Sequence, residues 1–129
     1  MKLAIIGSGN IVHDFLTITK DLKNIELTAI IGTTRSIDIL EQLQAEYHIG
    51  TVYTDFDKAL AEGDFDTVYV AVPNFLHYGF AKKALENGKN VISEKPFTVK
   101  YEEFEDLKQI ALAKDLILVE AITNQYLQN

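Results

Sequence analysis

A glycine-rich turn near the amino terminus is the first segment that could bind a ligand. It reads Gly7-Ser8-Gly9-Asn10-Ile11 and lies between an apolar run and a helix-like segment. In a dinucleotide-binding turn, the first glycine permits a tight bend, the second lets the backbone approach a pyrophosphate, and the helix N-terminus offers free N–H groups. We therefore predict that these five residues bind a nucleotide. The alternative is a glycine turn that serves the fold alone, which is favoured by Val12 standing where the motif usually has a small residue.

The second loop, Gly32-Thr33-Thr34-Arg35-Ser36, concerns the choice between NAD and NADP. A site that prefers NAD usually has an acidic residue after the second strand, where it holds the ribose hydroxyls. This loop has none, and Glu26 stands at the start of the preceding apolar run, which is the wrong edge of a sheet. Thr33, Thr34 and Arg35 instead offer donors for a 2′-phosphate. NADP is therefore slightly favoured over NAD, unless the loop is only a polar turn in which Ser36 caps a helix.

A third loop follows another apolar run and contains Ala71, Val72, Pro73, Asn74 and, in the next turn, His77. Pro73 ends the strand and fixes the backbone where a nicotinamide ribose would pass, and Asn74 offers a donor and acceptors. His77 falls in the first turn of the next helix, where the helix dipole disfavours its protonated form. We predict that all five residues bind the cofactor. The alternative for His77 is a surface or capping histidine, because a lone histidine is rarely catalytic without a partner.

A charged pair, Glu94-Lys95, directly follows the next apolar run and precedes Pro96. Such charges either point into a site or form a solvated ion pair that ends the strand, and the loop by itself leaves both interpretations open. A partly desolvated lysine has a lowered pKa, so Lys95 could hold a substrate hydroxyl or carbonyl oxygen and transfer a proton to it. Lys95 is therefore the predicted catalytic residue, and we predict that Glu94 and Lys95 also line the cofactor site.

These four loops need a scaffold that brings them together, and the apolar pattern predicts one. Short runs rich in β-branched residues recur at residues 3–6, 25–31, 67–72 and 91–93, with a further candidate at 116–119 and a short extended piece at 51–54. Most are continuously apolar, which is typical of strands in a parallel sheet covered on both faces. Helix-like segments alternate with them, so the predicted fold is an α/β doubly wound parallel sheet in three layers. Ligands bind such sheets at the carboxyl ends of the strands, where the four loops fall.

Capping residues and apolar stripes mark the predicted helices. Ser36 can cap a helix over residues 37–47, Asp55 a short helix through Leu60, and Thr98 a helix near Tyr101, while Gly88 is placed to end one. Apolar residues repeat at helical spacing at Ile11, Phe15, Ile18 and Leu22, at Leu76, Phe80 and Ala84, and at Phe104, Leu107 and Ala111. Each stripe predicts a helix face that packs against the sheet.

Composition and charge narrow the class of protein. With 129 residues, of which 47% are hydrophobic, the chain is predicted to fold as one domain over residues 1–129. Its formal net charge of -7 and its single arginine, Arg35, leave no basic face for nucleic acid. There is no cysteine, and His13 and His48 have no partner at ligand spacing, so no metal site is predicted. The apolar runs are too short to cross a bilayer or to act as a signal peptide, which predicts a cytoplasmic protein without a membrane partner.

Taken together, the loops resemble those of the glucose-fructose oxidoreductase, inositol dehydrogenase and rhizopine-catabolism (Gfo/Idh/MocA) family of nicotinamide-dependent oxidoreductases. The resemblance covers nearly the whole chain, and its most specific parts are Ala71-Val72-Pro73-Asn74-Phe75-Leu76-His77, Gly88-Lys89-Asn90-Val91-Ile92-Ser93-Glu94-Lys95-Pro96-Phe97 and Val119-Glu120-Ala121. It implies a Rossmann domain that binds NAD or NADP, with Lys95 beside the nicotinamide and the substrate. It also implies hydride transfer between the cofactor and a hydroxyl of a sugar, an inositol or a related polyol.

Members of this family normally continue into a second α/β domain that forms most of the substrate pocket. The resemblance therefore implies that residues 1–129 are the cofactor-binding domain of a longer enzyme, without the substrate domain and inactive alone. A stand-alone nicotinamide-nucleotide-binding module that senses redox state without turnover is the alternative. An adenosylmethionine-binding methyltransferase shares the glycine-rich loop but leaves Glu94-Lys95-Pro96 unexplained. Without the second domain, apolar surface near Phe97 and residues 121–127 should be uncovered, which predicts a homo-oligomer.

Overall fold

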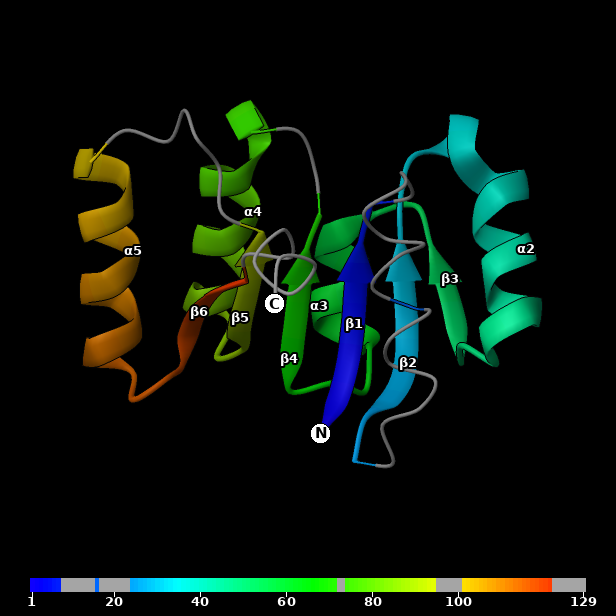
Figure 1. Ribbon diagram of the computed structural model, residues 1–129, viewed down its shortest axis with the longest axis horizontal. Helices are drawn as coiled ribbons and strands as arrows, with labels where there is room; N and C mark the ends of the chain where they lie inside the picture. Colours follow the sequence, from blue (N-terminus) through cyan, green and yellow to red (C-terminus); the bar gives the residue numbers. More distant parts are fainter. Residues whose placement is uncertain (8–15, 17–23, 72–73, 95–100, 122–129) are drawn as a thin grey trace, which may run out of the picture.

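The computed structural model describes residues 1–7, 16, 24–71, 74–94 and 101–121 (Figure 1). Their elements are β1 (Lys2–Ile6), β2 (Glu26–Ile31), the short 3₁₀ helix η1 (Thr34–Ser36), α2 (Ile37–Tyr47), β3 (Thr51–Tyr53), α3 (Phe56–Glu62), β4 (Thr67–Val70), α4 (Asn74–Glu86), β5 (Asn90–Glu94), α5 (Tyr101–Ala113) and β6 (Leu118–Ala121). From β2 onward, strands and helices alternate as the sequence predicts.

All six strands belong to one parallel sheet, in the order β3-β2-β1-β4-β5-β6. The chain runs outward from β1 to β3, then returns to place β4 on the other side of β1 and continues outward to β6. This order is that of a doubly wound sheet with its switch point between β1 and β4. The predicted α/β doubly wound parallel sheet is confirmed.

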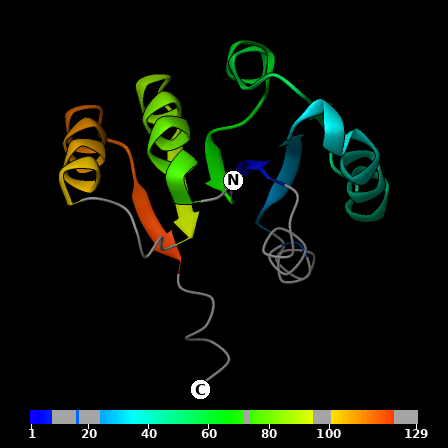
Figure 2. The ribbon, with the colours of Figure 1, turned by 90° about the horizontal axis from the view of Figure 1, so that it is seen from above.

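Helices cover both faces of the sheet, as in the predicted three-layer arrangement. Helices α3, α4 and α5 lie side by side along one face (Figure 2), where Val68 and Val91 of the strands pack with Leu85 and Leu107 of the helices. On the other face, α2 contributes Leu40 to a second cluster of buried residues. Burial of this apolar surface is the main favourable contribution to folding. It also explains the apolar sequences of the central strands β1 and β4, whose residues are buried on both faces of the sheet apart from Lys2.

The apolar stripes of α4 and α5 are confirmed where the structure describes them. Ala84, Leu107 and Ala111 are buried, and Phe80 packs partly buried against the same cluster. The stripe predicted over residues 11–22 lies outside the described residues. Leu16 is described there, and it is fully buried. Within the described ranges, no helix has the length and apolar composition that crossing a membrane requires.

Two predicted helix boundaries are confirmed by hydrogen bonds. The Asp55 carboxylate accepts hydrogen bonds from the N–H groups of Asp57 and Lys58, at 3.0 and 3.3 Å, and so caps α3. Gly88 follows the end of α4 with a φ of 79°, and its N–H donates to the carbonyl of Leu85 at 3.0 Å. A glycine in the left-handed region is a usual way to end a helix.

The predicted cap at Ser36 is wrong. Ser36 stands at the N-cap position of α2, but its side chain makes no capping hydrogen bond. The reason is its backbone, because Ser36 closes the 3₁₀ turn η1 and lacks the extended conformation that a capping residue usually has. Its hydroxyl lies 3.2 Å from that of Thr33 instead. The predicted cap at Thr98 lies outside the described residues.

The last strand begins later than the sequence predicts. The apolar run indicated a strand over residues 116–119, whereas β6 spans Leu118–Ala121. Leu116 instead takes part in the turn that caps α5, because its N–H donates to the carbonyl of Ala111 at 2.8 Å. Asp115 before it has a left-handed φ of 56°. These two features form a helix C-cap, so the chain must reverse before the strand can start.

Candidate cofactor site

The sheet brings the predicted loops together at the carboxyl ends of its strands, the upper edge in Figure 1. The strands β2, β1, β4 and β5 are consecutive neighbours, so the loops that follow them lie side by side. Backbone hydrogen bonds join their first residues. The Gly7 N–H donates to the carbonyl of Ile31 and the Ala71 N–H to the carbonyl of Ile6, both at 2.9 Å. Backbone hydrogen bonds therefore link the starts of three of the four predicted loops, those that follow β1, β2 and β4.

Gly7 has the backbone conformation that the predicted phosphate turn needs. Its φ is 128°, in a region where a side chain is strained and glycine is not. The chain can therefore turn sharply at the end of β1, close to the switch point of the sheet. Ser8, Gly9, Asn10 and Ile11 lie outside the described residues, so their contact with a phosphate stays a prediction.

Gly32 positions the second loop, and sequence reasoning did not assign it a role. Its N–H donates to the carbonyl of Tyr53 at 3.1 Å, which ties the end of β2 to the end of β3. A Cβ at Gly32 would lie 2.9 Å from Cδ1 of Leu40, so glycine lets α2 pack close to the start of the loop. The only sequence signal was a glycine directly after an apolar run. The close approach of α2 depends on tertiary packing.

The loop that begins at Thr33 presents hydroxyl groups and one cation. Thr33, Thr34 and Arg35 are exposed, and the hydroxyls of Thr33 and Ser36 face each other at 3.2 Å. Arg35 forms no ion pair with another described residue. Glu26 begins β2 and therefore lies at the opposite edge of the sheet, as predicted. The arrangement can bind a phosphate group through the exposed Arg35 guanidinium and neighbouring hydroxyls.

The other predicted residues lie at the ends of β4 and β5. Ala71 is half-buried beside β1, Asn74 begins α4, and His77 falls in the first turn of that helix. Glu94 is the last residue of β5. Their backbone positions agree with the predicted loops, while Val72, Pro73, Lys95 and the side chains of Asn74, His77 and Glu94 lie outside what the structure describes. The roles of these residues in binding and catalysis stay predictions.

Described groups with a shifted pKa lie outside the four predicted loops. At the amino ends of the strands, a hydrogen bond to Asp64 at 2.8 Å raises the pKa of Lys2. Between α4 and α5, a hydrogen bond with Tyr78 raises the pKa of Lys82 and lowers that of Asp106. The described residues also contain no group of three or more histidine or acidic residues that could hold a metal ion.

The described residues fit a dinucleotide at this edge. Gly7 and Gly32 keep the ends of β1 and β2 free of side chains, and Arg35 with its neighbours supplies donors for a phosphate. A bound dinucleotide needs such a close backbone approach at the switch point of the sheet.

Comparison with known proteins places the chain in a family. A family model described as an oxidoreductase family with an NAD-binding Rossmann fold matches residues 1–121. The chain is 33% identical over 129 residues to scyllo-inositol 2-dehydrogenase (NADP(+)) IolU from Bacillus subtilis. That match covers 100% of this chain and 39% of the relative. The chain therefore spans less than half the length of this relative.

Solved structures share the fold. The 3-ketoreductase KijD10 from Actinomadura kijaniata, in complex with NADP and TDP-benzene, has a TM-score of 0.84 at 29% identity, and the match covers 93% of this chain and 36% of that one. The scyllo-inositol dehydrogenase from Lactobacillus casei, with bound NAD(H) and scyllo-inositol, has a TM-score of 0.85 at 24% identity, with 98% of this chain and 37% of that one covered. The resemblance inferred from the loops is confirmed, and the chain belongs to the Gfo/Idh/MocA oxidoreductase family, as its NAD-binding Rossmann-fold domain.

Proposed function

We propose that this chain binds NADP in preference to NAD, and that it serves an oxidoreductase acting on a sugar, an inositol or a related polyol. The observation that carries the preference is the loop after β2. Its Arg35 is exposed and has no ion pair with a described residue, and no acidic residue stands between β2 and α2. A guanidinium suits a 2′-phosphate, whereas an NAD site usually has a carboxylate that holds the ribose hydroxyls.

The names of the relatives support a nicotinamide cofactor without choosing between the two forms. The Bacillus subtilis relative is named for NADP(+), and KijD10 was solved with NADP. The Lactobacillus casei protein was solved with NAD(H). Similar proteins use either form, so the preference of this chain has to come from its own residues. The residues of the loop after β2 are the ones that differ from those of a usual NAD site.

The proposed roles divide between binding and proton transfer. The cofactor supplies the hydride acceptor or donor when it is bound. Gly7 and Gly9 would let the backbone approach the pyrophosphate, and Arg35 would pair with the 2′-phosphate. Asn74 would offer hydrogen bonds on the nicotinamide side. Lys95 would hold the substrate oxygen, take up the hydroxyl proton when an alcohol is oxidised, and return it when a carbonyl is reduced.

The proposal extends to the setting in which the chain acts. We propose that residues 1–129 form one cofactor-binding domain in the cytoplasm and that a second domain completes the substrate pocket. The support is that the match leaves most of the Bacillus subtilis relative uncovered. The chain alone should therefore bind the cofactor but turn over no polyol, because catalysis needs both reactants held in reacting geometry.

Calorimetric titration of residues 1–129 with NADP and with NAD tests the preference. NADP should bind more tightly, and Arg35→Ala should weaken NADP by about tenfold, or 1.4 kcal/mol, while NAD affinity stays nearly constant. Lys58→Ala is the matched control, because it removes one exposed positive charge from α3, outside the predicted loop. Equal or tighter binding of NAD, or unchanged NADP affinity in Arg35→Ala, would contradict the preference.

A further inference from the structure

Helices α4 and α5 start after the two loops that are predicted to hold the nicotinamide half of the cofactor and the substrate. Helix α4 begins at Asn74 and α5 at Tyr101, and the two helices lie side by side on one face of the sheet (Figures 1 and 2). In a doubly wound sheet, each half binds one mononucleotide of the dinucleotide, and the glycine turn after β1 belongs to the adenosine half. The spacing between α4 and α5 therefore bears on the nicotinamide half alone.

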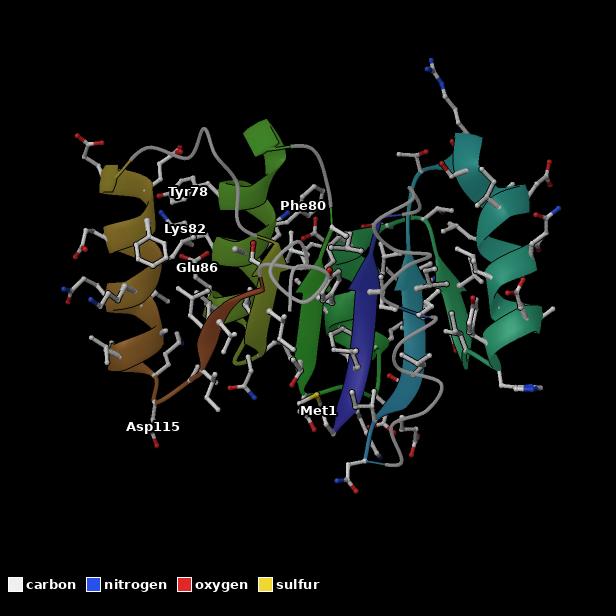
Figure 3. The ribbon with its side chains drawn as sticks, in the orientation of Figure 1. Met1, Tyr78, Phe80, Lys82, Glu86 and Asp115 are labelled. Atoms are coloured by element: carbon white, nitrogen blue, oxygen red, sulfur yellow. The ribbon has the colours of Figure 1, made fainter. Side chains whose placement is uncertain are left out.

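A polar bridge joins these helices near their amino ends. The Tyr78 hydroxyl on α4 donates to Oδ2 of Asp106 on α5 at 2.5 Å. Lys82, one turn further along α4, donates to the Tyr78 hydroxyl at 3.2 Å and lies 3.4 Å from the same Asp106 oxygen. Figure 3 shows Tyr78 and Lys82 in the space between the two helices. We call these three side chains the Tyr78–Lys82–Asp106 bridge.

Charge strengthens the hydrogen bonds of this bridge, although the Lys82 and Asp106 side chains are 38% and 42% exposed. The hydrogen bond from Tyr78 lowers the pKa of Asp106, and the hydrogen bond to Tyr78 raises the pKa of Lys82. Both groups are therefore charged near neutral pH, and hydrogen bonds to charged groups are stronger than neutral ones. The Lys82 ammonium also lies 5.4 Å from the centre of the Tyr78 ring, within the range of a cation–π interaction.

The opposite side of α4 is held independently. Phe80 contacts Phe56 of α3, with ring centroids 5.3 Å apart, and Lys83 forms an ion pair with Asp57 of α3 at 2.8 Å. Figure 3 shows Phe80 on the side of α4 that faces away from Tyr78. Removing the bridge should therefore leave α4 attached to α3 and to the core, and change mainly its placement relative to α5.

We propose that Tyr78 is a positioning residue whose hydrogen bond to Asp106 holds α4 and α5 at the separation that the nicotinamide-side loops require. The inference rests on the proposed binding of a nicotinamide cofactor. It assigns Tyr78 no contact with the cofactor or the substrate, since the hydroxyl is engaged by Asp106 and Lys82 between the helices.

Tyr78→Phe tests the proposal, because it removes the hydroxyl and keeps the partly buried ring. Two probes are titrated into residues 1–129: NADPH, and 2′,5′-ADP, which represents only its adenosine half. The affinity for NADPH should fall by about three- to tenfold, while that for 2′,5′-ADP should change by less than about twofold, because its loops follow β1 and β2. A merely structural role would weaken both probes together.

Three further variants sharpen the test. Asp106→Asn keeps an acceptor and should lose less NADPH affinity than Asp106→Ala. The double variant Tyr78→Phe/Asp106→Ala should lose no more than the larger single loss, because both changes remove the same contact. Lys83→Ala is the matched control: it removes an ion pair from the same helix, on the side of α3, and should leave both affinities unchanged.

The outcomes separate this inference from the proposed function. Equal weakening of the two probes in Tyr78→Phe and Asp106→Ala, or no change in either probe in Tyr78→Phe, would overturn the role of Tyr78 and leave the proposed function in place. If the unaltered chain binds neither NADPH nor NADH, the proposed function fails and the inference fails with it. Thermal unfolding of each variant, followed by circular dichroism, establishes that folded proteins are compared.

Discussion

At the scale of single residues, backbone conformation prepares the described part of the cofactor site more than charge does. Gly7 turns the chain at a φ of 128°, and Gly32 leaves room for Leu40, which a Cβ would approach to 2.9 Å. The two glycines act differently, because the first relieves backbone strain and the second a side-chain contact. Gly7 lies at the switch point between β1 and β4, where a pyrophosphate needs close backbone approach, and Gly32 lies one strand away, at the end of β2.

Lys95 is predicted to act on the substrate and not on the adenosine half of the cofactor. Lys95→Ala in this chain should therefore change dinucleotide affinity by less than about tenfold, or 1.4 kcal/mol. Gly9→Val is the contrasting variant, because a branched side chain should block the pyrophosphate and abolish binding in a fluorescence titration. If Lys95→Ala costs as much affinity as Gly9→Val, Lys95 is a structural charge at the end of a strand.

In an enzyme that contains both domains, the same lysine should control the rate. Lys95→Ala should then lower kcat by roughly 10²- to 10⁴-fold, the usual contribution of a positioned proton-transfer group. Lys95→Arg should not restore it, because a guanidinium keeps its proton near neutral pH. An unchanged kcat in Lys95→Ala would remove the lysine from the active site.

At the scale of elements, helix ends decide where the next strand can begin. Among the residues that the structure describes, three with left-handed backbone follow helices: His48 after α2, Gly88 after α4 and Asp115 after α5, with φ values of 57°, 79° and 56°. The sequence predicted that Gly88 ends a helix. It missed the end of α5, because aspartate in this conformation is not distinguished by local pattern from aspartate in a helix or a turn.

Gly79 and Gly88 offer a matched test of backbone effects on stability. At both positions, an added Cβ would meet no atom within 4 Å, so substitution by alanine causes no crowding. Gly79 lies inside α4, and Gly79→Ala should raise the free energy of unfolding by about 0.5–1 kcal/mol. Gly88 has a φ of 79°, so Gly88→Ala should lower it by about 1–2 kcal/mol. Urea denaturation measures both, and shifts of the same sign would contradict the argument.

At the scale of the whole molecule, the edge of the sheet at β6 carries exposed apolar side chains. Ile117 and Val119 are 62% and 44% exposed, and Leu112 of α5 is 68% exposed. The Val91 N–H of β5 donates to the carbonyl of Ile117. Backbone N–H and C=O groups of successive residues point to opposite sides of a strand, so those of Leu118 and Glu120 point away from β5. Such an edge is a template for another strand. The surface was predicted near Phe97 and residues 121–127, and except for the backbone of Ala121 it lies outside the described residues.

We expect this edge to pair with a second copy of the chain. Two antiparallel β6 strands centred on Val119 would place Leu118 opposite Glu120 of the second copy, so their outward backbone groups meet. Val119→Lys should then shift sedimentation velocity profiles toward the monomer, because like charges would face each other. Ile39→Lys, at a position 48% exposed on α2, is the control and should not. A strictly monomeric unaltered chain at high concentration would contradict the pairing.

Much of the fold and part of the site were predictable because their signals are local. Apolar runs marked β1 and β4 to within two residues at each end, and Asp55 and Gly88 marked helix boundaries, since each acts on residues within one turn. The tight turn at Gly7 was predictable because this glycine directly follows an apolar run. The alternation of strands and helices was enough to predict a doubly wound sheet. Ligands bind such sheets at the carboxyl ends of the strands, so the fold also indicated the edge of the candidate site.

Some features were missed although they are local, since Ser36 and Thr33 are three residues apart and the cap of α5 joins Leu116 to Ala111. Others were decided only when distant segments packed together. Gly32 lies where α2 approaches the end of β2. The hydrogen bond between Tyr78 and Asp106 joins residues 28 positions apart, on helices that become neighbours only because β4, β5 and β6 pair in that order. Local propensity carries no information about such contacts, because their geometry is set by how the helices pack over the finished sheet.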